Sequence, residues 1–147
     1  KAFLATTSTL PLSGCVFVSV LDADKPQVVD AVIEMRRLGF NILATGGTAR
    51  YLLSKGVPVE RVYKVQDGER PHIVDRMANG EVDLVVNTTQ DKKAVVDSFS
   101  IRETALMSDI PYVTTIEAFK AVVAAIGRLR KEPLGVRSLQ EYYGDAV

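Results

Sequence analysis

The sequence predicts an α/β domain of three layers, in which a five-stranded, mainly parallel sheet is flanked by helices. Short, nearly continuous apolar runs such as "VDLVVNTT" alternate along the chain with longer segments of helical spacing. Strands that are apolar on both faces are typical of a parallel sheet covered by helices on both sides. About five such strands can be counted, which is a usual size for this kind of sheet.

The expected strands follow from these apolar runs and from the turn residues that bound them. The run "CVFVSVL" is bounded by Gly14 and by the turn residues Asp22 and Asp24. The run "VERVYKV" contains fewer apolar residues than "CVFVSVL" and is expected to be a short strand. We expect strands at 15–21, 40–45, 59–65, 82–89 and 110–115.

The expected helices are marked by their ends as well as by their spacing. Asp24 is a plausible N-cap with Pro26 in the first turn, and Gly39 follows as a C-cap. Thr48 stands near the start of the second helix, and Thr114 with Glu117 fits a capping box before the last one. We expect helices at 27–40, 48–56, 70–80, 92–108 and 116–131.

Composition limits the possible functions of these 147 residues, which are most simply one domain. The formal net charge is zero, so no basic surplus is present to hold a nucleic-acid backbone. Apolar stretches are too short to span a bilayer, and no secretory signal opens the chain. Cys15 and His72 are single, which excludes an internal disulfide and a multi-histidine metal site. Cys15 is expected to be a buried small hydrophobe.

Hydroxyl and amide side chains gather where the expected strands end, and this edge is where parallel sheets bind ligands. The segment "TGGT" follows the second strand, and its glycines would let backbone N–H groups of the next helix approach a phosphate. A tight strand-to-helix turn explains the same letters, and the two readings stay open. The residues at this edge are Ser19, Lys25, Thr45, Gly46, Gly47, Thr48, Asn87, Thr88, Thr89, Tyr112, Thr114 and Thr115.

Two further sets of polar residues have a functional and a structural reading. Lys64 could reach the same edge of the sheet or could be a solvated surface lysine. His72 and Asp75 are three residues apart and could form an acid–base pair on one helix face. Capping and packing at a helix start explain this pair more simply.

Several segments together resemble a known family in order and spacing: "GCVFVSVLDADK", "GFNILATGGTARYL", "VYKVQDGERPHIVDRMANGEVDLVVNTT", "DSFSIRETAL" and "IPYVTTIEAF". They are similar to the C-terminal allosteric domain of carbamoyl-phosphate synthetase large chains, in the methylglyoxal-synthase-like (Rossmann-like) superfamily. The tail "VRSLQEYY" fits the last element of that family. The resemblance implies a domain at 14–147, with 1–13 a linker from a preceding synthetase domain, and it accounts for a first residue other than Met.

The resemblance also implies a regulatory function without chemistry of its own. The parent enzyme is a cytoplasmic ligase that makes carbamoyl phosphate for pyrimidine and arginine biosynthesis, with a glutaminase small chain, ATP, Mg or Mn, and K. No cofactor is implied in this domain, which in bacterial members binds UMP as inhibitor and IMP as activator at one overlapping site. Ornithine binds at the interface with a synthetase domain, where Tyr112 and Thr114 match this domain's share. The implied effector residues are Ser19, Lys25, Thr45, Gly46, Gly47, Thr48, Lys64, Asn87, Thr88 and Thr89.

One departure separates this chain from the methylglyoxal synthases of the same superfamily. Their Gly-Gly-Asp catalytic motif is absent near "GERPHIVD", where Arg70 or its neighbours stand. A lyase acting on dihydroxyacetone phosphate remains the alternative, with His72 and Asp75 as the best substitute for the missing base. In animal urea-cycle members of the family, this domain binds the activator N-acetylglutamate. In this chain, the segment "NTT" and Lys64 favour a nucleotide as the effector. A purely structural interface domain is the third possibility.

Overall fold

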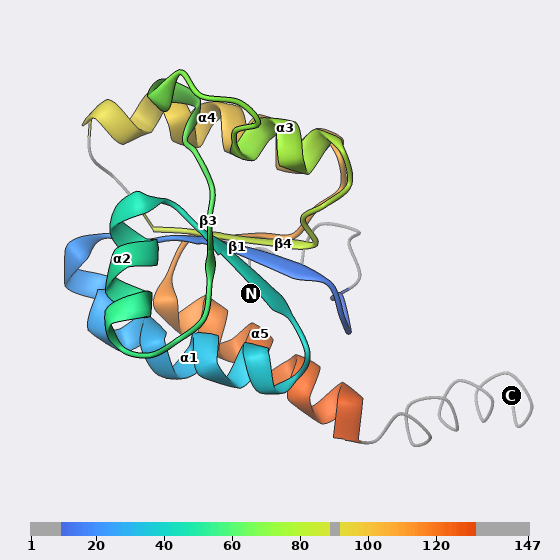
Figure 1. Ribbon diagram of the computed structural model, residues 1–147. Coiled ribbons are helices and arrows are strands. Elements are labelled where there is room, and N and C mark those ends of the chain that lie inside the picture. Colours follow the sequence, from blue (N-terminus) through green and yellow to red (C-terminus); the bar gives the residue numbers. More distant parts are fainter. Residues whose placement is uncertain (1–9, 89–91, 132–147) are drawn as a thin grey trace, which may run out of the picture.

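The computed structural model describes residues 10–88 and 92–131, in which strands and helices alternate along the chain (Figure 1). Every strand pairing is parallel, and the strand order is β3-β2-β1-β4-β5. The strands are β1 (Cys15–Ser19), β2 (Asn41–Ala44), β3 (Glu60–Arg61), β4 (Leu84–Asn87) and β5 (Tyr112–Val113). The α-helices are α1 (Lys25–Arg37), α2 (Gly46–Ser54), α3 (Ile73–Ala78), α4 (Lys92–Met107) and α5 (Ile116–Lys131). Two 3-10 turns are η2 (Asp22–Asp24) and η3 (Val65–Asp67).

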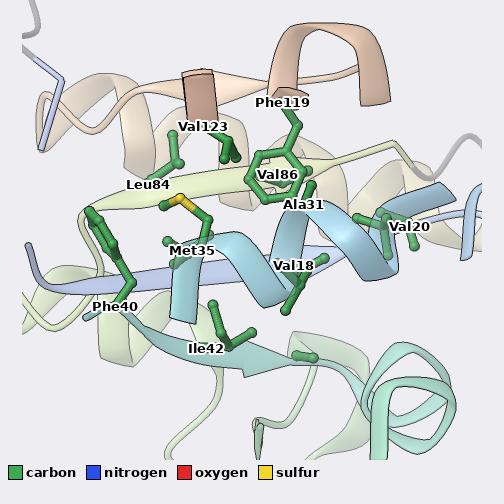
Figure 2. Packing of buried hydrophobic residues seen from close by; sticks show 14 of the residues in the cluster. Val18, Val20, Ala31, Met35, Phe40, Ile42, Leu84, Val86, Phe119 and Val123 are labelled. Atoms are coloured by element: carbon green, nitrogen blue, oxygen red, sulfur yellow. The ribbon is translucent and has the colours of Figure 1, made fainter. Parts of the chain in front are cut away.

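The helices cover both faces of the sheet, as a sheet apolar on both sides requires (Figure 1). Helices α1, α2 and α5 lie over one face, and α3 and α4 lie over the other. Because successive side chains of a strand point to opposite faces, Val16 and Val18 enter the first core and Phe17 the second. Figure 2 shows Met35 of α1 and Phe119 of α5 inside the first core, against the central strands. The predicted fold class is therefore confirmed.

The order of the strands places one crevice at the centre of the sheet. From β1 the chain adds β2 and then β3 on one side, and it then crosses to the other side for β4 and β5. The strand order therefore reverses between β1 and β4, and such a switch point is where open α/β sheets bind ligands. Ser19 and Asn87 are partners in register at the carboxyl ends of these two strands. They mark the crevice from which a site can be built.

The edge strands are shorter than expected. The strand predicted at 59–65 is only Glu60–Arg61, followed by a hydrogen bond of 2.9 Å from Val62 N–H to the Ala44 carbonyl. Strand β2 ends at Ala44, because α2 begins two residues later, so nothing remains for a longer β3 to pair with. Tyr63 instead forms an isolated parallel bridge with His72.

One predicted helix cap is displaced in the structure, and another has the predicted position without a side-chain hydrogen bond. Helix α5 begins at Ile116, and Thr115 Oγ1 accepts a hydrogen bond of 3.1 Å from Ala118 N–H. The capping residue is therefore Thr115, and the prediction of Thr114 is wrong by one position. Asp24 does occupy the N-cap position of α1, but its side chain makes no capping hydrogen bond.

Some sequence predictions fall on residues that the structure does not describe. They are most of the linker at 1–13, the tail "VRSLQEYY" and Thr89. Within 10–88 and 92–131, no helix is long and apolar enough to cross a membrane.

Candidate anion-binding site

Helix α2 begins directly after β2, and its first turn faces the crevice at the carboxyl edge of the sheet. Thr45 is the N-cap residue and Gly46 is the first helical residue. The start predicted at Thr48 is two residues late, and Thr48 lies inside the first turn, where it is only 3% exposed. Its Oγ1 accepts a hydrogen bond of 3.2 Å from Val20 N–H, which ties the turn to the chain after β1.

The first turn of α2 has unsatisfied backbone donors. Thr45 stands in the capping position, but its side chain makes no capping hydrogen bond. The first intrahelical bond runs from Ala49 N–H to the Thr45 carbonyl at 2.6 Å. Within the described residues, no acceptor meets the N–H groups of Gly46, Gly47 and Thr48. Three free donors at the positive end of a helix make a site that favours an anion.

The two glycines of this turn are not required by its backbone conformation. Neither Gly46 nor Gly47 has a positive φ, so other residues could adopt the same backbone. A methyl group on Gly47 would lie 3.2 Å from Lys25 Nζ, and one on Gly46 would lie 3.5 Å from Arg61 Nη2. The absence of side chains leaves the N–H groups accessible between two cations, which supports a ligand over a plain turn.

Lys25 supplies the first cation. Its side chain is only 15% exposed, and its Nζ forms an ion pair with Asp22, whose side chain is 92% exposed. The hydrogen bond and the charge of Lys25 lower the pKa of the Asp22 carboxyl. An anion bound on α2 would therefore meet a lysine that is held in place and whose ion-pair partner, among the described residues, is one solvent-exposed carboxylate.

The buried polar side chains of the described residues all lie at this edge of the sheet. Thr45 Oγ1 donates to Ser19 Oγ at 3.2 Å, and Thr88 Oγ1 accepts from Leu21 N–H at 3.0 Å. Buried polar groups are costly to keep, so their gathering at one place indicates a role beyond packing. The set comprises Ser19, Thr45, Thr48, Asn87 and Thr88.

The second cation, Arg61, was not among the residues predicted from sequence. Arg61 is the register partner of Ala44, the residue just before the N-cap of α2. Neighbouring residues in parallel strands point to the same face, and Ala44 faces the core under α1, α2 and α5. The Arg61 side chain therefore reaches the start of α2. In the sequence, Arg61 is only a charged residue inside a short expected strand. Its closeness to α2 becomes apparent only when the pairing of Arg61 with Ala44 is known.

The remaining predicted residues are placed less closely. Lys64 is the N-cap residue of η3, where its backbone N–H donates to Asp67 at 2.9 Å. No described contact joins its side chain to Lys25 or the α2 turn. Tyr112 is joined to the site through Asn87, whose amide donates to its hydroxyl at 3.0 Å. Thr114 is exposed at the end of β5.

His72 and Asp75 are engaged at the start of α3. His72 is the N-cap residue: its Nδ1 accepts from Asp75 N–H at 3.3 Å, and Asp75 accepts from His72 N–H at 3.0 Å. Asp75 also pairs with Arg70. The hydrogen bond from His72 N–H lowers the pKa of Asp75, and the nearby Arg70 adds to this effect. The helix begins at Ile73, three residues later than predicted. His72 and Asp75 therefore cap the start of α3, as the structural reading of the pair predicts.

Two other features bear on the chemistry of the chain. Burial raises the pKa of the Cys15 thiol to about 11, although the side chain is only partly buried rather than fully buried as expected. In the part of the chain that the structure describes, no group of three or more His, Cys, Asp or Glu residues could hold a metal ion.

The chain is similar to known proteins in sequence and in fold. The sequence matches the MGS-like domain family over residues 27–114. It is 47% identical over 144 residues to a "Carbamoyl phosphate synthase large chain" of Myxococcus xanthus, covering 98% of this chain but 13% of that protein. It is 42% identical to a "Carbamoyl phosphate synthase large chain, C-terminal section" of Aquifex aeolicus, covering 97% of this chain and 27% of that one.

A solved structure shows the same fold. A methylglyoxal synthase from Elizabethkingia anophelis superposes with a TM-score of 0.61 at 20% identity, covering 78% of this chain and 79% of that one. The chain thus spans a small part of the length of its large-chain relatives, and it matches their C-terminal section. On the family match, on these relatives and on the fold, the chain belongs to the family of MGS-like domains.

Proposed function

We propose that this chain is the regulatory domain of a carbamoyl-phosphate synthase large chain and that it binds nucleotide effectors, with UMP as inhibitor and IMP as activator. The observation that carries the proposal is the first turn of α2, where three N–H groups have no described acceptor and lie next to Lys25. A phosphate monoester offers several acceptor oxygens and up to two negative charges, which matches these donors and this cation.

The other effector residues would line the crevice between β1 and β4. Ser19, Asn87 and Thr88 are buried there and carry the hydroxyl and amide groups that suit a ribose and a base. Lys64 and Thr89 complete the proposed set. Tyr112 and Thr114 would contribute to an ornithine site completed by a synthetase domain, so the chain by itself should bind ornithine poorly.

The proposed mechanism is thermodynamic coupling rather than catalysis. An effector changes the activity of distant sites only if it binds one state of the whole enzyme better than another. The partners would be the rest of the large chain and a glutaminase small chain, in the cytoplasm. ATP and the metal ions of the parent enzyme would act outside this domain.

Calorimetry with UMP and IMP on the 147-residue chain tests the proposal. We expect saturable binding that is strongly weakened in Lys25→Ala and in Thr48→Ala. Lys55→Ala is the matched control, because Lys55 lies at the opposite end of α2 and should leave affinity unchanged. Absence of binding by the wild-type chain, or equal binding by Lys25→Ala, would remove the assignment.

The lyase alternative is tested separately by measuring methylglyoxal release from dihydroxyacetone phosphate. Its best candidate base lies in the capping box of α3, where Asp75 already accepts from His72 N–H and pairs with Arg70. We therefore expect no turnover above the rate without protein. Robust turnover would contradict the proposal of a non-catalytic domain.

A further inference from the structure

We propose that Arg61 is a ligand of the effector's phosphate group. This inference rests on the proposed function, because it assigns one more residue to the same anion site. Arg61 stands on β3, a strand that contributes no other residue to the expected site.

The first argument is the direction of the guanidinium. From the place where a Gly46 Cβ would stand, Arg61 Nη2 is 3.5 Å away and Nε is 3.6 Å away. These two nitrogens form one edge of the guanidinium, and that edge binds two oxygens of a phosphate or carboxylate at once. On the neighbouring Gly47, Lys25 Nζ has the equivalent position at 3.2 Å. The free N–H groups of the α2 turn thus lie between the ammonium group of Lys25 and the guanidinium edge of Arg61.

The second argument is that Arg61 has no carboxylate partner within the described residues. The adjacent Glu60 pairs with Arg76 instead, at 3.0 Å. The Arg61 guanidinium carbon lies 5.7 Å from the centre of the Tyr63 ring, a cation–π contact that holds the side chain without neutralising it. A charge that is held in place but not neutralised is suited to an external anion.

The third argument comes from the two buried hydroxyls beside the turn. Ser19 is 6% exposed and Thr45 is 3% exposed, and their hydroxyls share one hydrogen bond. Two hydroxyls carry two protons, so one proton remains without an acceptor among the described residues. This buried donor is the Ser19 hydroxyl, at the carboxyl end of β1 and hydrogen-bonded to the N-cap residue of α2. It is independent of Arg61, and it also calls for a ligand that offers acceptor oxygens.

Calorimetry on the 147-residue chain with UMP, uridine and inorganic phosphate tests the inference. Arg61→Gln should weaken UMP affinity by about ten- to a hundredfold, the usual effect of losing a hydrogen bond to a charged group. Arg61→Lys should lie between Gln and wild type, because it keeps the charge but loses the fork. Arg128→Gln is the control, since it removes the same charge from an exposed site on α5.

The outcomes separate the inference from the proposed function. If the wild type binds UMP and Arg61→Gln binds it equally well, the role of Arg61 is overturned and the effector site stands. If the wild type binds none of the three probes, both fail. An equal loss in Arg128→Gln would also overturn the inference, because it would reduce the effect to net charge. Loss of phosphate affinity in Arg61→Gln with uridine affinity unchanged would support a contact to the phosphate itself.

Discussion

The side-chain amide of Asn87 donates a hydrogen bond of 3.0 Å to the hydroxyl of Tyr112. The bond joins the carboxyl end of β4 to β5, its neighbour at the edge of the sheet. Under the proposed function Asn87 belongs to the effector site and Tyr112 to the ornithine site. The two sites would therefore share a direct hydrogen bond, and a ligand that moves one side chain would act on the other.

Removing the Tyr112 hydroxyl tests this bond. Tyr112→Phe keeps the ring that lies 5.3 Å from the Arg102 guanidinium but leaves the Asn87 amide without this acceptor. We expect the free energy of unfolding, measured in urea, to fall by about 1 kcal/mol, the usual net worth of such a bond. Tyr51→Phe is the control, because the described contact of Tyr51 uses its ring face and Lys55. Equal stability of Tyr112→Phe and wild type would contradict the role of the bond.

The raised pKa of Cys15 predicts an unreactive thiol. Burial raises this pKa from 9.0 to about 11, so at about pH 8 the thiolate fraction in the folded chain is about a hundredfold lower than in the unfolded chain. A thiol reagent such as 5,5′-dithiobis(2-nitrobenzoate) should therefore react far more slowly with the native chain than with the chain in urea. Native and unfolded rates within a few-fold of each other would contradict a buried, protonated thiol.

The lowered pKa of Asp75 predicts a loss of stability in acid. A carboxyl whose pKa is lower in the folded chain binds fewer protons there than when unfolded, so its stabilisation is complete above the unfolded pKa of about 4. As the pH falls below that value, the stabilisation is lost progressively. Asp75→Asn should be less stable than wild type near neutral pH, and the difference should shrink in acid. Urea unfolding at several pH values measures this.

Asp30→Asn is the control for that series. Asp30 is exposed on α1, and no described ion pair involves it. The free energy of unfolding of Asp30→Asn should equal that of the wild type at every pH. If the stability difference between Asp75→Asn and wild type did not change with pH, the stabilisation by Asp75 would not depend on its charge.

The sequence predicted the centre of the molecule better than its edges. Strands β1 and β4 are buried on both faces, so their apolar runs could be recognised without knowing their neighbours. The edge strand predicted at 59–65 shrank to Glu60–Arg61, because its length depends on where β2 stops. The cap of α5 is displaced by one position, since the neighbouring threonines at 114 and 115 are equally good candidates from their letters alone. The start of α2 lies two residues before the predicted one, at Gly46.

The site follows the same rule. Lys25 and the "TGGT" turn are close in the structure because they follow adjacent parallel strands, which the order of elements already indicated. Arg61 was missed because its position depends on the pairing Ala44↔Arg61, and a register between an edge strand and its neighbour is not readable from composition or spacing. The sequence therefore indicated the types of residue at the site but not the strand pairing that brings Arg61 to it.

Gly47→Ala distinguishes a glycine kept for ligand access from one kept for the turn. The φ of Gly47 is not positive, and the new methyl group would meet only the flexible end of Lys25 at 3.2 Å. Alanine is also the better helix former, by up to about 1 kcal/mol in a helix interior. We expect Gly47→Ala to unfold at the same or higher urea concentration than wild type, while its affinity for UMP falls strongly because the methyl group covers the N–H groups and displaces Lys25.

Gly127→Ala is the matched control for this variant. Gly127 lies in α5, has no positive φ, and would place its methyl group in open space. It should show the same gain in helix propensity without any change in UMP affinity. If Gly47→Ala instead lost stability and kept its affinity, the glycine would serve the turn, and the α2 N-terminus would no longer be supported as the phosphate site.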